Sequence, residues 1–343
     1  MNHDVSRSGR LVITAALLAA LLTQQAVRAS NISINTVSVG NAGNGADHTG
    51  FGSVAYGYRI GATEVTNAQY AEFLNAVDPT GANVFELYST NMSFSAAVGG
   101  GIEFNAGAAS GTKYSVTTGR GNLPVNWVSW YDTIRFANWL HNGQGSGDTE
   151  TGAYTLLGGT PTPSNGEAIT RNPGATWVLA TEDEWYKAAF HKNDGVTANY
   201  FKFATSSDSI PAQGPPPGGT NSANGHAAFL GDMTEVGAYI NSTSPYGTFD
   251  QSGNLWEWNE SFFSGTDRVL RGGAFANQFG GFDFELSVDG VRFAPGDFEW
   301  FNLGFRVAVV PEPSSLAIAA TALAGALFLS RRRTSRELCE VRR

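Results

Sequence analysis

The stretch that decides the fold reads FDQSGNLWEWNES at residues 249–261 and, after a short spacer, RVLRGGAF at residues 268–275. Trp256 and Trp258 enclose the carboxylate of Glu257, directly after a Ser-Gly-Asn turn. Gly272 and Gly273 follow, where the chain can turn without a Cβ in the way. So many aromatic, amide and glycine residues close together indicate either a tightly folded core junction or a functional site.

Upstream of this stretch, three helix starts carry capping boxes, in which a Ser or Thr and a residue three positions later satisfy each other's free backbone amides. The boxes begin at Thr66, Ser129 and Thr181. Apolar residues at helical spacing follow each box. We therefore expect short helices that end before Asp78-Pro79, at residues 141–143, and near Phe190.

The rest of the chain predicts short strands and long loops. Alternating residues favour strands at 54–60 and 153–157, and an apolar run favours one at 177–179. Glycine-, serine- or proline-rich stretches at 81–120, 143–173 and 205–225 are expected to be loops, and the first is expected to contain short strands. With no clear break in composition, we predict one domain over residues 30–309. Trp130, Trp139, Trp185 and Trp258 are expected in its core, because large aromatic side chains dominate core packing.

Six segments occur in an order that resembles the sulfatase-modifying factor family, the domain of the formylglycine-generating enzyme. They are EVTNAQYAEFLNAV (64–77), PVNWVSWYDTIRFANWL (124–140), WVLATEDEWYKAAF (177–190), GNLWEW (253–258), RVLRGGAF (268–275) and LGFRVA (303–308). The resemblance implies an α+β fold: a single irregular C-type-lectin-like domain with short helices around small twisted sheets and many loops.

The resemblance implies an oxidase that converts a cysteine of a sulfatase to formylglycine, using oxygen and copper held by two cysteines. The matching positions lie near Asn277 and Phe282, and neither is a cysteine. The chain's single cysteine is Cys339, beyond the domain. Because soft thiolates are the ligands that select Cu(I), we expect no copper-dependent activity, and whether the protein is an enzyme at all stays uncertain.

Calcium is the cofactor for which this sequence still has the ligand residues that the resemblance implies. In the family, the Asn and Glu of the GN-x-W-E pattern hold Ca²⁺ with a backbone carbonyl between them. The matching positions are Asn254, Leu255 and Glu257, and a second site would use Asn224. Ca²⁺ prefers six to eight oxygen ligands, which such loops can supply. The alternative for Asn254 and Glu257 is a buried polar network around Gly253.

Two arginines leave structural and functional interpretations open. Arg271 could bind a substrate anion, or it could pair with an acidic loop residue such as Asp267. Arg306 in the GFR segment has the character of a structural ion pair. For both, the structural interpretation is favoured.

Both ends of the chain carry export signals. Residues 1–29 resemble a signal peptide, with Arg7 and Arg10 before an apolar run at 11–22 and a small-residue cleavage site at Ala29. At 310–343, Pro-Glu-Pro precedes an apolar run at 316–329 and three arginines. This tail resembles the PEP-CTERM sorting signal, which implies cleavage by an exosortase. Signal peptidase and exosortase are thus expected partners, and a transient membrane anchor is expected before release to the surface.

The net negative charge of the chain limits the classes of ligand that it can bind. Residues 30–330 contain 12 basic and 27 acidic residues, and such an acidic surface excludes nucleic acid, which needs a basic face. Two interpretations remain. The favoured one is a non-catalytic, exported binding or matrix protein of the cell surface that contacts exopolysaccharide or a surface protein through its long loops. The alternative is a divergent oxidoreductase of the family.

Overall fold

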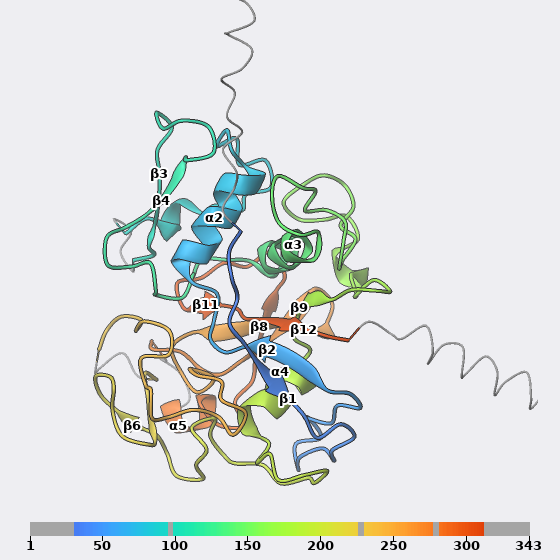
Figure 1. Cartoon of the computed structure of the whole chain (residues 1–343), viewed down its shortest axis with the longest axis vertical. Helices are drawn as coiled ribbons and strands as arrows, with labels where there is room; N and C mark the ends of the chain where they lie inside the picture. The colour runs from blue at the N-terminus through green and yellow to red at the C-terminus, as the bar shows by residue number, and fades with distance from the viewer. Residues whose placement is uncertain (1–30, 95–98, 226–229, 277–280, 312–343) are drawn as a thin grey trace, which may run out of the picture.

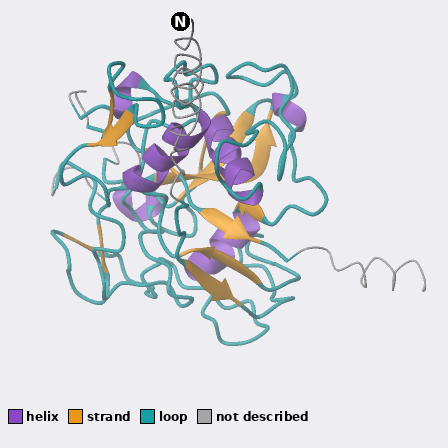
Figure 2. Ribbon diagram, turned by 45° about the horizontal axis from the view of Figure 1, so that its top comes forward, coloured by secondary structure: helices purple, strands orange, loops and turns teal. Residues whose placement is uncertain are grey.

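The computed structural model describes residues 31–94, 99–225, 230–276 and 281–311, and loops make up most of this part (Figures 1 and 2). The helices are α2 (Asn67–Val77), α3 (Trp130–His141), α4 (Glu182–Phe190) and the one-turn α5 (Phe282–Glu285), with 3-10 turns at Thr90–Met92 and Gly166–Ala168. The strands are β1 (Thr36–Val39), β2 (Tyr58–Gly61), β3 (Ile102–Phe104), β4 (Tyr114–Val116), β5 (Trp177–Leu179), β6 (Ala212–Gln213), β7 (Ser222–Ala223), β8 (Trp256–Ser264), β9 (Asp267–Arg271), β10 (Arg292–Pro295), β11 (Leu303–Gly304) and β12 (Val307–Val309).

The three predicted helices form with the predicted caps. Thr66, Ser129 and Thr181 each accept a hydrogen bond from the backbone amide three residues later, and the side chain at that position accepts one from the cap amide. α2 ends at Val77, with Asp78 as its C-cap, and α4 runs from Glu182 to Phe190. The capping boxes therefore located these helices correctly from sequence.

Two four-stranded sheets meet near the end of the chain. The first has the order β1-β2-β12-β5 and the second β10-β9-β8-β11. β12 lies between β2 and β5, and β11 pairs in parallel with the start of β8, so that Gly304 lies opposite Glu257. Only Phe305 and Arg306 separate β11 from β12. Arg306 is thereby fixed at the junction of the two sheets. β8, β11 and β12 lie near the middle of the fold in Figure 1.

Aromatic side chains fill the core, as predicted. Trp130, Trp139, Trp185 and Trp258 are all buried. Rings from α2 and α3 pack against one another, with Phe73 5.3 Å from Phe136 between ring centroids. Since one such ring buries about 150–250 Å², a small set of them compensates for the scarcity of regular structure.

α3 departs from the one-sided pattern of its sequence, because every residue from Trp130 to Leu140 is buried. The loop at 143–173 wraps its outer side. Arg135 pairs with Glu150 at 2.6 Å, and Asn138 donates to the carbonyls of Thr149 and Tyr154. This loop is consequently an ordered cover for the helix.

Two predicted strands were wrong in extent or existence. At 54–60 the strand begins only at Tyr58, because the Val54 carbonyl accepts a hydrogen bond from Gly43 in a loop. At 153–157 no strand forms. There the Asn138 side chain takes the place of a neighbouring strand by bonding both the amide and the carbonyl of Tyr154.

The loop at 81–120 contains the short pair β3–β4, in agreement with the short strands predicted there. The loop at 205–225 agrees with the sequence apart from the short pair β6–β7. The signal segment predicted at 1–29 lies outside the described residues, as does the sorting segment predicted at 310–343 from residue 312 onward. Within the described residues, no helix has the length and apolar character needed to cross a membrane.

Candidate functional site

We call residues 249–275 the landmark stretch. A tight turn before β8 connects its two halves, residues 249–261 and 268–275. Gly253 and Asn254 both have left-handed backbones, with φ of +113° and +63°. A Cβ on Gly253 would lie 2.5 Å from the carbonyl oxygen of Asn224, so only glycine fits. The Gly253 amide donates to the carbonyl of Gly272 at 2.7 Å. GNLWEW and RGG thus form one unit.

Asn254 is the centre of a buried polar network. Its backbone amide donates to the Asn224 carbonyl at 2.8 Å, and its side-chain oxygen accepts from the Thr234 amide at 3.0 Å. The Asn224 side chain in turn donates to the Asp232 carbonyl. Buried polar groups need such partners, and here they tie residues 224–234 to the turn.

Glu257 has different partners and forms a fully buried ion pair with Arg306. Two parallel hydrogen bonds of 2.6 Å join its oxygens to Nε and Nη2 of Arg306, and Trp185 Nε1 donates to it at 2.9 Å. Burial by itself lowers the pKa of Arg306, but the charge and hydrogen bonds of Glu257 outweigh it and raise the pKa. The structural interpretation of Arg306 is confirmed.

Two further carboxyl groups act on the same guanidinium. Glu64 and Asp250 lie within electrostatic range of Arg306. Burial, followed by the charges of Asp250 and Glu257, raises the pKa of Glu64 well above its usual range. Burial likewise raises the pKa of Asp250 to about 6. Sequence reasoning missed this cluster, because Glu64 precedes a capping box and nothing in the pattern marks it as buried.

Arg271 is also buried in an ion pair, but its partner is not the predicted one. Its Nε donates to Glu182 at 2.8 Å, and its Nη1 donates to the carbonyls of Val288 and Gly290, each at 2.9 Å. Asp267 instead lies opposite Pro295, at the far end of β9. The structural interpretation holds, and the partner Asp267 was wrong. Glu182 could have been considered from sequence, since it begins the acidic first turn of α4.

The positions that match the family's cysteines are only partly described. Asn277 and the side chain of Phe282 lie outside the described residues. The neighbouring Phe275 donates its amide to the Asn254 carbonyl at 2.8 Å, and Ala276 is buried. RVLRGGAF therefore leads from β9 back to the turn around Asn254.

The predicted calcium ligands are divided between two environments. Asn224 and Asn254 lie together, whereas Glu257 is directed at Arg306 and Trp185. A carboxylate offers about four lone-pair sites, and three at Glu257 are used. Within the described residues, no group of three or more His, Cys, Asp or Glu side chains is placed to hold a metal ion. Calcium bound mainly by amide and carbonyl oxygens stays a prediction.

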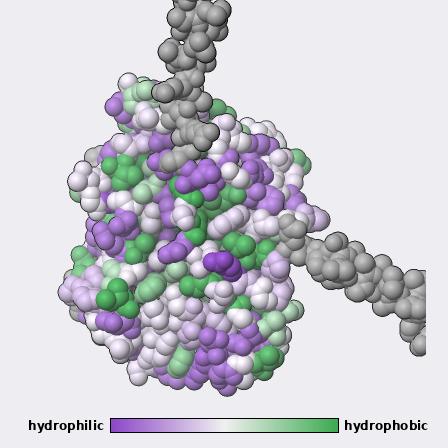
Figure 3. All heavy atoms as spheres, viewed as in Figure 1, coloured by the Kyte–Doolittle hydropathy of each residue, from purple (hydrophilic) through white to green (hydrophobic). Residues whose placement is uncertain are grey.

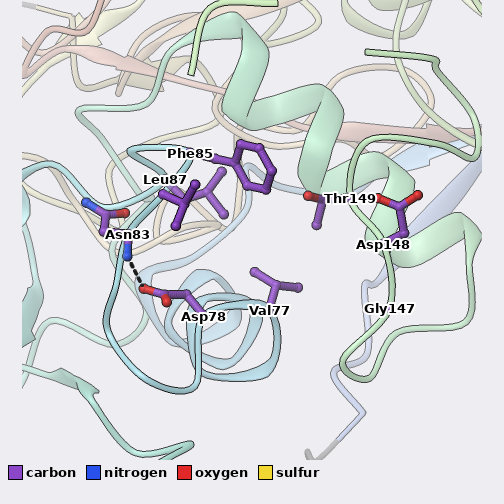
Figure 4. Close-up of a pocket in the computed structure, with 9 residues that line it drawn as sticks. Val77, Asp78, Asn83, Phe85, Leu87, Gly147, Asp148 and Thr149 are labelled. Atoms are coloured by element: carbon purple, nitrogen blue, oxygen red, sulfur yellow. Dashed lines mark hydrogen bonds between the residues drawn. The ribbon is translucent and has the colours of Figure 1, made fainter. Parts of the chain in front are cut away.

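A small surface pocket lies where two of the predicted loops meet. It has a volume of about 190 Å³ and lies between the end of α2, residues 83–87 and residues 147–149 (Figure 4). Asp78 points into this region, but its oxygens accept from the amides of Ala82 and Asn83 at 2.9 Å. Pockets for drug-sized ligands measure about 300–1,000 Å³. This pocket is too small for such a ligand.

The outer surface is mixed. On the face shown in Figure 3, hydrophobic residues form several small patches separated by hydrophilic ones. Together, an irregular α+β scaffold, a GN-x-W-E turn and buried arginine–carboxylate pairs define a C-type-lectin-like domain.

The sequence matches the sulfatase-modifying factor enzyme 1-like domain over residues 24–310 and the PEP-CTERM protein-sorting motif over residues 309–333. The chain belongs to the sulfatase-modifying factor enzyme 1-like family. With its sorting motif, it is an exported protein of this family that is associated with the cell surface, and the motif implies processing by an exosortase. A comparison with curated proteins found no match.

Solved structures confirm the fold. Treponema denticola variable protein 1 aligns with a TM-score of 0.51 and 20% identity, over 82% of this chain and 97% of that one. CarF aligns with a TM-score of 0.50 and 21% identity, over 81% of this chain and 99% of its own. At these identities the likeness concerns the fold alone.

Proposed function

We propose that this protein is a binding or matrix protein of the cell surface that has kept the family's scaffold without its copper chemistry. The observation that carries the proposal is that charged residues of the landmark stretch form buried ion pairs within the fold. Glu257 and Arg271 are each bound in a buried arginine–carboxylate pair. They stabilise the fold and are not presented to a substrate.

The cysteine content supports the same proposal. The family reaction, as the resemblance implies it, needs two thiolates at the copper, and Cys339 is the chain's single cysteine. It follows the sorting motif, which ends at residue 333. An exosortase cut near Pro-Glu-Pro would separate it from the domain. The exported domain would then offer no thiolate as a nucleophile or a soft metal ligand.

The ligand of such a protein is exopolysaccharide or another surface protein, reached through the long loops. The chain's net charge of −9 favours neutral or cationic ligands over polyanions. Calcium bound at Asn254, Leu255 and Glu257, or at Asn224, would have a structural role in presenting those loops.

One experiment tests the absence of copper chemistry directly. The purified full chain is incubated with a peptide that contains a sulfatase cysteine motif, with copper and oxygen, and the product is analysed by mass spectrometry. We expect no formylglycine above a blank without protein. Formation of formylglycine would contradict the proposal.

A divergent oxidoreductase is the second candidate, and membership in a family named for an enzyme favours it. Such an activity would need accessible reactive groups near residues 276–282. A screen of the full chain for oxygen consumption with thiol peptides distinguishes it from a binding protein. A glycan array with and without chelator tests binding and calcium dependence together.

A further inference from the structure

Exposed aromatic rings gather around one short segment of the chain, residues 293–301. Phe293, Phe298 and Trp300 are 41%, 42% and 45% exposed, and Phe263 of β8, which packs on Phe293, is 54% exposed. Of the other seven tryptophans, five are buried, and Trp127 and Trp177 are half-buried. Large apolar groups left together on a surface indicate a binding site.

These rings are ordered in two parallel pairs. The ring centroids of Phe263 and Phe293 are 3.6 Å apart at an interplanar angle of 11°. Those of Phe298 and Trp300 are 5.8 Å apart at 16°. Trp127 supports Trp300 from below, donating its amide to the Trp300 carbonyl at 3.2 Å and packing ring against ring at 5.8 Å. Flat faces are thus presented in fixed orientations.

A hollow lined by both polar and apolar residues adjoins this aromatic segment. It has a volume of about 330 Å³, and its lining includes Thr162, Ser164, Asn165 and Glu167 of the loop that covers α3. Gly296 lies between the hollow and the exposed rings. Its amide donates to the carbonyl of Thr266, which lines the hollow, and its carbonyl accepts from the Trp130 amide at 3.0 Å.

We infer that the rings of Phe298 and Trp300 and the adjoining hollow bind a neutral polysaccharide. A pyranose ring has a flat face of C–H groups, which fits the negative face of an aromatic ring. Its hydroxyl groups can exchange hydrogen bonds with hydroxyl, amide and carboxylate side chains like those of Ser164, Asn165 and Glu167. The inference rests on the proposed binding function and names its ligand class and its face.

The charge of the face selects among ligands. Asp297 lies between the two ring pairs in sequence, and both Asp297 and Glu167 are exposed. These carboxylates repel polymers of uronic acids or sulfated sugars. A dry protein interface is depleted of charged residues at its centre. The exposed carboxylate of Asp297, next to the exposed rings of Phe298 and Trp300, fits a hydrated sugar chain better than a protein partner.

The test is affinity gel electrophoresis of the full chain in gels that contain galactomannan, mixed-linkage glucan or alginate. We expect retardation by at least one neutral polymer and none by alginate. Trp300→Ala and Phe298→Ala should each weaken binding at least about tenfold, the effect of losing about 1.4 kcal/mol at a contact ring. Trp300→Phe keeps a flat ring and should bind within about threefold of the natural protein.

Phe284→Ala is the matched control, because Phe284 is 48% exposed but belongs to α5, outside this face and the long loops. It should bind like the natural protein. Thermal melts establish that each variant is folded. Unchanged binding by both folded face variants would overturn the assigned face while leaving the binding function intact. Retardation by alginate alone, or by no polysaccharide, would overturn the ligand class, and the glycan array and formylglycine assay judge the proposed function separately.

Discussion

Arg306 and Glu257 form a completely buried ion pair at the point where β11, β12 and β8 meet. Each of the two hydrogen bonds measures 2.6 Å. Arg306 also donates to the carbonyls of Gly61 and Phe249. The side chain of Arg306 therefore connects both sheets with the start of the landmark stretch. Through it the GFR segment is bound to the GN-x-W-E segment in the folded chain.

Replacing Arg306 should lower the free energy of unfolding more than replacing Glu257, its main partner. Arg306→Met leaves the carboxylates of Glu257 and Asp250 buried without a counter-charge, so we expect a loss of about 3–5 kcal/mol in the free energy of unfolding. Glu257→Gln should cost less, because the charge of Asp250 still acts on Arg306. Urea denaturation measures both. Lys192→Ala, in the exposed Lys192–Asp208 pair, should change stability by less than about 0.5 kcal/mol. Equal costs for both core variants would contradict this reasoning.

Calcium should raise the melting temperature if the amide and carbonyl oxygens around Asn254 hold it. A ligand at 100 times its dissociation constant stabilises the folded state by about 2.7 kcal/mol. Differential scanning fluorimetry in calcium, magnesium and chelator measures this effect. Asn254→Ala should abolish the calcium-specific shift, and Asn224→Ala should reduce it only if the second site exists. Identical melting curves in calcium and in chelator would contradict the predicted calcium site.

The side chain of Asn138 should be essential for the loop that covers α3. It bonds the Thr149 carbonyl and both backbone groups of Tyr154. Asn138→Leu keeps the volume but leaves these buried groups without partners, at about 1–3 kcal/mol for each buried group that stays unsatisfied. We expect a total loss of at least about 2 kcal/mol in urea denaturation. Asn165→Leu, at a half-buried position in the same loop, serves as the control and should lose less.

The contrast between Thr181 and Asn138 shows what the sequence could and could not predict. Thr181 caps a helix through residues three positions away, so local spacing was sufficient to place α4. Asn138 acts on residues across a loop, and its position inside a helix gives no sign of that role. The same holds for Arg271, whose partner Glu182 is 89 positions away. Local rules therefore predicted the helices, and the resemblance of six ordered segments to a known family predicted the fold. Charge pairing depends on contacts that only the folded chain makes.

Stability should decline as the pH rises through the neutral range, because several buried carboxyl groups keep their protons in the folded state. Burial, followed by the charge of Asp132, raises the pKa of Glu299 to about 8, and Glu86 adds to the repulsion while Ser89 opposes it. The unfolded chain releases this proton near pH 4.5. Between these values the folded state binds more protons, so the free energy of unfolding falls with increasing pH.

Glu299→Gln should flatten this dependence, because the amide needs no proton to stay neutral. We expect the variant to be more stable than the natural protein by about 1–2 kcal/mol at pH 9 and nearly equal to it at pH 5, after allowance for partial solvent screening. A residual slope below pH 6 should persist, since burial also raises the pKa of Asp132 to about 6. Urea denaturation at pH 5, 7 and 9 measures the slopes, with Asp297→Asn as the exposed control. If the glutamine variant kept the full slope between pH 6 and pH 9, the proton would reside on another group.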